Sequence, residues 1–173
     1  MKRVSISILS CTVTLLLMVF LGCNSQKNKL TLKEHLIKVA TDYASKQLRN
    51  PEVKTLQDST VMIGDTSKRY FIQTSGVFTG LIDGDDRPDG IVSMTSMAKR
   101  GGRLTELLII LNSNDKYLMV KSVESDMKIL SLKDRVITAE VPTHPVNNPL
   151  HDCPVCIVVE RFRFENGGLT KLK

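Results

Sequence analysis

The sequence predicts an α+β fold in which one N-terminal helix packs on an antiparallel β-sheet. Three observations lead to this class: one stretch of helical periodicity, a long series of strand-like runs after Pro51, and short connections between those runs. Connections of about 4 to 6 residues are too short for helical crossovers, so a parallel βαβ arrangement is disfavoured.

The helix is expected from about Thr31 to Arg49. Thr31-Leu32-Lys33-Glu34 has the form of a capping box, in which Thr31 and Glu34 each bond the other's backbone N–H. Apolar residues then recur at helical spacing and provide one face for a sheet to cover: Leu32, Leu36, Val39, Ala40 and Tyr43. Asn50-Pro51 ends the pattern.

Seven strand-like runs follow, and turn signals separate most of them. The turn signals contain Gly, Asn, Asp and Ser, which tolerate positive φ or form local side-chain turns. They lie at 65–67, 101–102, 112–115 and 166–168. The expected strands span 60–63, 69–74, 90–97, 104–111, 117–123, 135–141 and 156–164.

The start of the chain has the pattern of an export signal. Lys2-Arg3 precedes an apolar run from about Val4 to Leu21, and its Ser and Thr residues favour a cleaved signal peptide over a permanent membrane span. Phe20-Leu21-Gly22-Cys23 resembles the lipobox of bacterial lipoproteins, although Phe20 replaces the usual aliphatic residue. An ordinary signal peptide with an incidental cysteine is the alternative.

The lipobox resemblance implies a lipoprotein signal peptide over 1–22 and an acylated, palmitate-carrying Cys23. Residues 23–29 are polar and read as a flexible tether, followed by one globular domain over 30–173. Several acyl chains anchor a protein stably, whereas one chain alone is marginal. The tether contains no acidic residue. By resemblance to enteric lipoproteins, this favours the outer membrane, facing the periplasm.

The charge balance argues against a nucleic-acid partner. The signal peptide removes only Lys2 and Arg3 of 24 Lys and Arg, which leaves 22 basic against 18 acidic residues and a net charge of +4. Charges scattered in this way are typical of a solvated surface. The one basic cluster, Lys99 to Arg103, is expected as a turn between strands, with contact to anionic lipid headgroups as the functional alternative.

An acidic, Gly-rich turn covers 80–92 and contains Asp83-Gly84-Asp85-Asp86-Arg87-Pro88-Asp89. It resembles a single, degenerate copy of the Asp-Gly turn found in FG-GAP and VCBS-type repeats. That resemblance implies Ca²⁺ ligands at Asp83, Asp85 and Asp89, with the Arg87 carbonyl as a further ligand. Alternating carboxylates in a tight loop can converge on such a cation.

The turn departs from that pattern at two positions. Leu81 replaces the first Asp, and Asp86 replaces a Gly, so Asp86 must adopt a left-handed conformation or distort the loop. The alternative interpretation is a structural turn that caps a strand through Asx-type hydrogen bonds.

A cysteine pair, Cys153 and Cys156, precedes the last long strand. In an exported protein such a pair favours a disulfide, here closing a short loop. A zinc site using His144, His151 and both cysteines is an alternative. A thioredoxin-like redox pair is disfavoured, because a β-branched run follows instead of a helix.

No motif for catalysis is found, so the sequence predicts a non-enzyme. It contains no nucleophile elbow, no His-Glu-x-x-His and no phosphate loop. His35, on the expected helix beside Glu34, is expected to face solvent. The prediction is therefore a membrane-anchored module without a required cofactor that binds another envelope protein through an exposed sheet face or edge. A Ca²⁺-dependent binding domain is the alternative. There is no Trp and only three Tyr, which argues against a carbohydrate ligand.

Overall fold

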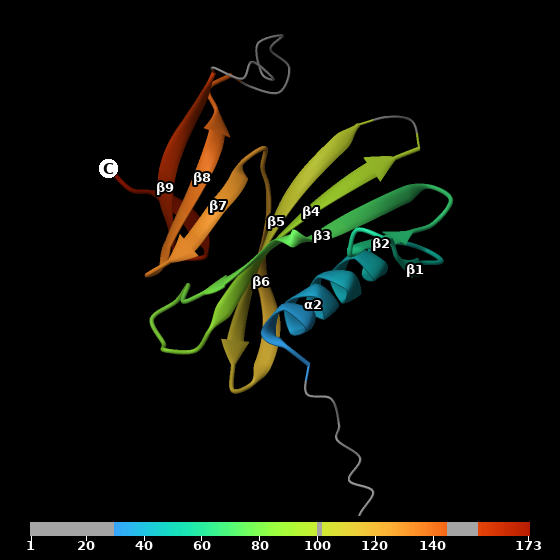
Figure 1. Ribbon diagram of the computed structural model, residues 1–173, viewed down its shortest axis with the longest axis horizontal. Coiled ribbons are helices and arrows are strands. Elements are labelled where there is room, and N and C mark those ends of the chain that lie inside the picture. Colours follow the sequence, from blue (N-terminus) through green and yellow to red (C-terminus); the bar gives the residue numbers. More distant parts are fainter. Residues whose placement is uncertain (1–29, 100–101, 145–155) are drawn as a thin grey trace, which may run out of the picture.

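The computed structural model describes residues 30–99, 102–144 and 156–173, which form one helix and ten strands (Figure 1). The predicted signal peptide, the lipid site Cys23 and the tether lie outside these residues. Within the described ranges, no helix is both long and apolar enough to cross a membrane.

Helix α2 (Leu32–Lys46) begins with the predicted capping box. The Glu34 N–H donates to Thr31 Oγ1 at 3.3 Å, and the Thr31 N–H donates to Glu34 Oε2 at 2.6 Å. This bond from the Thr31 backbone lowers the pKa of Glu34. The helix ends at Lys46, earlier than the expected Arg49, and its N-terminal boundary is confirmed.

A six-stranded antiparallel sheet follows the helix, in the order β1-β2-β3-β4-β5-β6. Its strand β3 runs past the expected end at Thr74, because an irregularity between Ile72 and Val77 lets pairing with β4 resume. The strands are β1 (Glu52–Thr55), β2 (Thr60–Gly64), β3 (Lys68–Gly80), β4 (Asp89–Ala98), β5 (Arg103–Ser113) and β6 (Lys116–Glu124).

A second antiparallel sheet contains the remaining four strands, in the order β10-β9-β8-β7. They are β7 (Lys128–Lys133), β8 (Val136–Pro142), β9 (Ile157–Glu165) and β10 (Gly168–Lys171). The α+β class with a helix on an antiparallel sheet is confirmed. Two sheets are formed instead of one, however, and strands β1, β7 and β10 were not expected.

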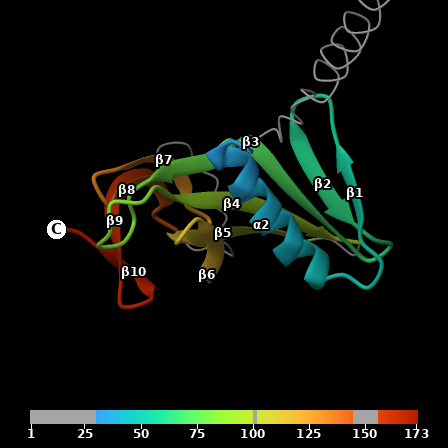
Figure 2. The same cartoon turned by 90° about the horizontal axis from the view of Figure 1, so that it is seen from below.

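The six-stranded sheet separates two hydrophobic cores. On β5, Leu108 and Ile110 point to the core under α2, whereas Leu107 and Ile109 point to the core shared with the four-stranded sheet. All four side chains are fully buried. Figure 2 shows α2 lying across one face of the long sheet, with β7, β8 and β9 beyond one end of the helix. The long sheet is therefore covered by the helix on one face and partly by the short sheet on the other.

The helix approaches the sheet closely at Gly90. A Cβ atom at this position would lie 2.1 Å from Leu36 Cδ1, far inside van der Waals contact. A polar contact fixes the other end of the helix, where Tyr43 donates a hydrogen bond to Glu106 Oε2 at 3.0 Å. Burial raises the pKa of Tyr43.

Three hairpins use two-residue turns in which both residues have positive φ, as a type I′ turn requires. They are Asn114-Asp115, Asp134-Arg135 and Asn166-Gly167. The first and third lie within the predicted turn signals. Arg135, with φ of 63°, has a side chain that rarely adopts this conformation.

Candidate functional site

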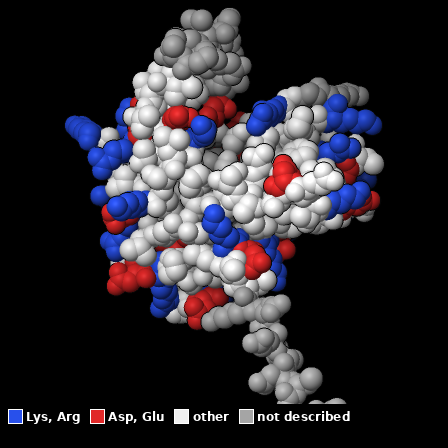
Figure 3. Space-filling model, viewed as in Figure 1, with Lys and Arg blue, Asp and Glu red and all other residues white. Residues whose placement is uncertain are grey.

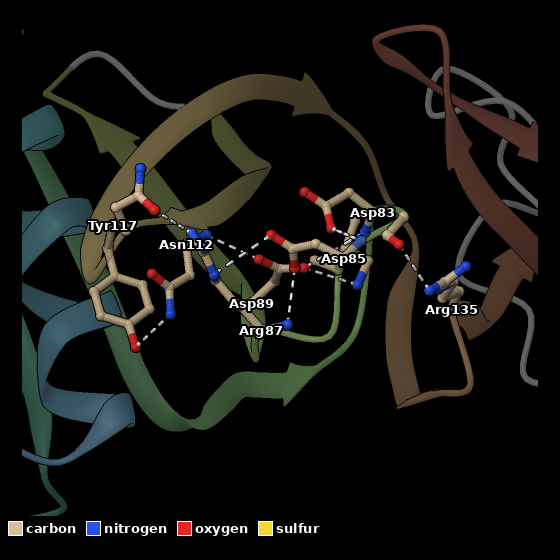
Figure 4. Close-up of polar contacts among 10 residues, drawn as sticks. Asp83, Asp85, Arg87, Asp89, Asn112, Tyr117 and Arg135 are labelled. Carbon is tan, nitrogen blue, oxygen red and sulfur yellow. Dashed lines mark hydrogen bonds and ion pairs between the residues drawn. The ribbon is translucent and has the colours of Figure 1, made fainter.

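The connection between β3 and β4 brings Asp83, Asp85 and Asp89 together, as Figure 4 shows. One carboxylate oxygen from each residue lies within 4.8 Å of the other two. The three residues singled out in the sequence are thus close enough to share a metal ion.

Local hydrogen bonds shape the outer part of this turn. The Asp85 N–H donates to Asp83 Oδ1 at 2.9 Å, and the Arg87 N–H donates to Asp85 Oδ1 at 2.8 Å. Both are Asx-type bonds to a residue two positions earlier. Both bonds use Oδ1, so the second oxygen of each carboxylate accepts neither of them. The Asp85 side chain is 41% exposed, so an ion could reach it from solvent.

Asp89 has a different environment, because its side chain is fully buried. Its carboxylate accepts backbone N–H bonds from Ile82 at 2.9 Å, Asp83 at 3.4 Å and Asn112 at 2.8 Å. Burial raises the pKa of Asp89, although the bonds from Asn112 and Ile82 oppose that shift. Asp89 therefore joins the start of the turn to β5.

Two arginines lie beside the acidic turn. Arg87 Nη1 donates to Asn114 Oδ1 at 2.8 Å, and its Nε lies 4.0 Å from Asp85 Oδ2. Arg135 Nη2, from the turn between β7 and β8, donates to the Gly84 carbonyl at 3.1 Å. The turn is thereby tied to both sheets. Asp86 does not adopt the left-handed conformation considered for it.

A cation of the Ca²⁺ type takes six to eight oxygens. Three monodentate carboxylates supply half of that number at most, so backbone carbonyls and water would have to complete the shell. The donor set is all oxygen, which fits Ca²⁺ or Mg²⁺ and does not favour zinc.

A chain of side chains links the acidic turn to the helix. Asn112, whose N–H binds Asp89, donates from Nδ2 to the Tyr117 hydroxyl at 3.3 Å. The Tyr117 ring stacks on His35 of α2, with ring centroids 5.2 Å apart. The expectation that His35 faces solvent is wrong, because this ring is half-buried against β6.

The cysteine pair is only partly within the described chain. Cys156 lies directly before β9, and its carbonyl accepts from the Thr143 N–H at 2.8 Å and from Thr143 Oγ1 at 2.9 Å. Cys153 and His151 lie outside the described residues. The disulfide and the zinc alternative therefore remain predictions.

A second candidate site lies on the six-stranded sheet, on the face opposite α2. The short sheet covers this face at Ile91, Leu107 and Ile109 but leaves the far ends of β2 to β5 open. Two hollows of about 330 and 460 Å³ lie side by side there and share Phe71 and Met97. Figure 1 shows the two sheets splaying apart, and the outline in Figure 3 is notched between them.

This surface, here named the open groove, comprises both hollows and combines apolar and polar side chains. Met97 is 50% exposed and Leu56 is 40% exposed, so the groove presents apolar side chains to solvent. The smaller hollow is lined by Leu56, Asp58, Thr60, Phe71, Gln73, Gly76, Ser93, Thr95, Met97 and Arg103. The larger hollow is lined by Asp65, Thr66, Ser67, Lys68, Arg69, Phe71, Met97, Ala98 and Lys99. In the sequence, only the basic stretch at Lys99 to Arg103 pointed to this surface. The other groove residues are far apart in the chain and are brought together by strand register.

Comparison with known proteins adds no assignment. No protein family matches the chain, and no curated protein or solved structure is significantly similar to it. The fold and the two candidate sites therefore have to be interpreted from their own chemistry.

Proposed function

We propose that this protein is a non-catalytic binding module, held on the bacterial envelope by acylation of Cys23, whose open groove binds a segment of another envelope protein. The observation that carries the proposal is the uncovered half of the six-stranded sheet. Apolar surface rimmed by polar residues is typical of protein interaction sites. Here Phe71, Met97 and Leu56 provide apolar surface within the groove.

The lining of the groove supports binding more than catalysis. In the described chain, none of its lining residues is a His or Cys that could act as base or nucleophile. Hydroxyl and amide side chains, Gln73, Ser93 and Thr95, instead provide donors and acceptors around the apolar centre. This composition resembles an interface core with a polar rim.

The anchor is tested by metabolic labelling. Cells expressing the full chain are grown with a radiolabelled or clickable palmitate, and the protein is compared with a Cys23→Ser variant. We expect label and membrane fractionation for the parent and neither for the variant. Label that persists in Cys23→Ser would refute acylation at this residue.

The groove is tested by site-specific photocrosslinking in the same cells. A photoreactive amino acid replaces Gln73, which is exposed on the groove face, or Lys33, which is exposed on α2 and serves as the matched control. We expect a discrete adduct, identified by mass spectrometry as an envelope protein, from position 73 only. The same adduct should be lost when Met97→Lys is added. Equal adducts from both positions would contradict the proposal.

A Ca²⁺-dependent binding domain is the second candidate, favoured by the convergence of Asp83, Asp85 and Asp89. Asp85 is the residue to substitute, because its side chain is partly exposed whereas Asp89 is buried within backbone bonds. A ligand at 100 times its Kd stabilises the folded state by about 2.7 kcal/mol, which corresponds to a rise in Tm of several degrees.

The measurement compares thermal unfolding of the purified protein in EDTA and in millimolar Ca²⁺. We expect a Ca²⁺-dependent rise in Tm for the parent and none for Asp85→Ala. An unchanged Tm in the parent would leave the turn as a structural element. A rise of equal size in both proteins would place the ion elsewhere.

A further inference from the structure

A row of like charges crosses the open groove. Antiparallel register pairs Arg69 of β3 with Met97 of β4, and Met97 with Arg103 of β5. The exposed methionine therefore lies between two guanidinium groups on neighbouring strands. Lys99, directly after the end of β4, lines the same hollow as Arg69. Figure 3 shows Lys and Arg side chains at this end of the molecule.

The path of Arg69 is fixed by its neighbour on β2. Gly64 pairs with Arg69, and a Cβ atom at Gly64 would lie 2.8 Å from Arg69 Cγ. The aliphatic part of Arg69 thus lies over Gly64, which leaves its charged end at the rim of the groove. A residue with a side chain at Gly64 would displace it.

Basic side chains outnumber acidic ones in the open groove. Its hollows contain Lys68, Arg69, Lys99 and Arg103 against Asp58 and Asp65. Within the described chain, no acidic side chain lies within ion-pair distance of Arg69, Lys99 or Arg103. The Asp65 carboxylate accepts N–H bonds of 2.7 Å from Ser67 and 3.0 Å from Lys68, so it is oriented toward its own turn. Aligned cations beside an apolar patch are unfavourable in the free protein and become favourable when a partner supplies negative charge.

We infer that the occupant of the open groove is an extended, acidic segment of the partner protein, an inference that rests on the proposed function. A carboxylate of that segment lies between Arg69 and Arg103, where the guanidinium groups can bind it by charge-assisted hydrogen bonds. An apolar side chain next to that carboxylate packs on Phe71 and Met97. Ser93 and Thr95 face the backbone of the segment.

The hollowed shape favours a peptide segment over a flat membrane surface. Phe71 lines both hollows, and a concave surface suits a narrow peptide segment better than a planar bilayer. Polar lining residues such as Gln73 and Thr95 also suit the amide groups of a peptide better than acyl chains. Binding to an anionic membrane through the same arginines is therefore a competing outcome of the test.

The experiment pans a phage-displayed library of random twelve-residue peptides on the purified protein. Enriched peptides are then synthesised with a fluorophore and titrated by fluorescence anisotropy. Arg69→Glu and Arg103→Glu are the test variants, and Lys33→Glu is the control for an equal change of charge. Circular dichroism checks that each variant is folded.

We expect enriched peptides with Asp or Glu next to an apolar residue. Their Kd should rise about 10-fold or more in Arg69→Glu and in Arg103→Glu, with no change in Lys33→Glu. Affinity should also fall with added salt.

Three other outcomes would overturn the inference. Enriched peptides without acidic residues that lose affinity in Phe71→Ala would leave the proposed function standing with a different partner chemistry. No enriched peptide, together with Arg69-dependent binding to vesicles containing phosphatidylglycerol, would assign the surface to the membrane. Failure of both peptide and vesicle binding would remove the inference and the proposed function together.

Discussion

Replacing Asp89 with alanine tests whether the acidic turn is held by this buried carboxylate. The substitution leaves the backbone N–H groups of Ile82 and Asn112 without their acceptor, at bonds that measure 2.9 and 2.8 Å in the parent. A buried donor that loses its partner costs about 1–3 kcal/mol, so two of them cost about 2–6 kcal/mol. Removing a buried charge offsets part of this cost. We therefore expect a loss of about 3 kcal/mol in the free energy of unfolding.

The assay is urea unfolding followed by far-ultraviolet circular dichroism, since the chain contains no Trp. With an m-value of about 2 kcal/mol/M, the midpoint should fall by about 1.5 M urea. Asp85→Ala is the matched control, because it removes one local bond at a partly exposed carboxylate and should cost about 1 kcal/mol or less. Equal losses in the two variants, or a loss below about 1 kcal/mol for Asp89→Ala, would refute the reasoning.

Stability should also depend on pH through Asp89. Its raised pKa means that, between the unfolded and the folded values, the folded state binds more protons than the unfolded chain. The contribution of this group thus favours folding as pH falls into that window and is lost as pH rises through the folded pKa. Asp65 acts in the opposite sense, because bonds from Ser67 lower its pKa. The contribution of Asp89 is therefore measured as the free energy of unfolding of the parent minus that of Asp89→Asn. This difference should decrease as pH rises.

Three further substitutions test the fold. Gly90→Ala should destabilise by about 1–3 kcal/mol in urea unfolding, because the new methyl group would overlap Leu36; a neutral result would show that the helix can move away. Thr31→Ala should cost about 1 kcal/mol in the same assay by removing the N-cap acceptor, and Thr31→Ser should restore it. Arg135→Gly removes a side chain held at positive φ, which is stabilising, and also loses the bond to the Gly84 carbonyl, which is destabilising. Because the two effects oppose each other, we expect little change in Tm. A large rise in Tm would show that this bond contributes little.

Much of the fold could be predicted from local sequence. The capping box at Thr31 determines where α2 begins, and apolar, strand-like runs bounded by turn residues locate the long strands. The three missed strands are short or poorly buried. In β1 all four residues are exposed, and in β7 only Ile129 is buried, so neither leaves a clear alternating pattern. The division into two sheets depends on long-range packing that no local pattern records.

The candidate sites, too, could be predicted only where their residues are close together in the sequence. The spacing of Asp83, Asp85 and Asp89 predicted that their carboxylates would converge, because all three lie within one tight loop. The role of Asp89 could not be predicted, because its partner Asn112 is 23 residues away. The open groove was missed for a similar reason, as register between β3, β4 and β5 aligns residues that are far apart in the chain.

The fully buried run on β5 couples the unfolding of the two layers. Leu107 and Ile109 belong to one core and Leu108 and Ile110 to the other, so a single strand supplies both. Detaching the short sheet would expose one side of that strand and weaken the pairing that also supports the helix. The two layers should therefore melt together, in one calorimetric transition whose calorimetric and van't Hoff enthalpies agree. A protein built in this way keeps its binding face and its acidic turn in the same folded unit, and loses both at the same temperature.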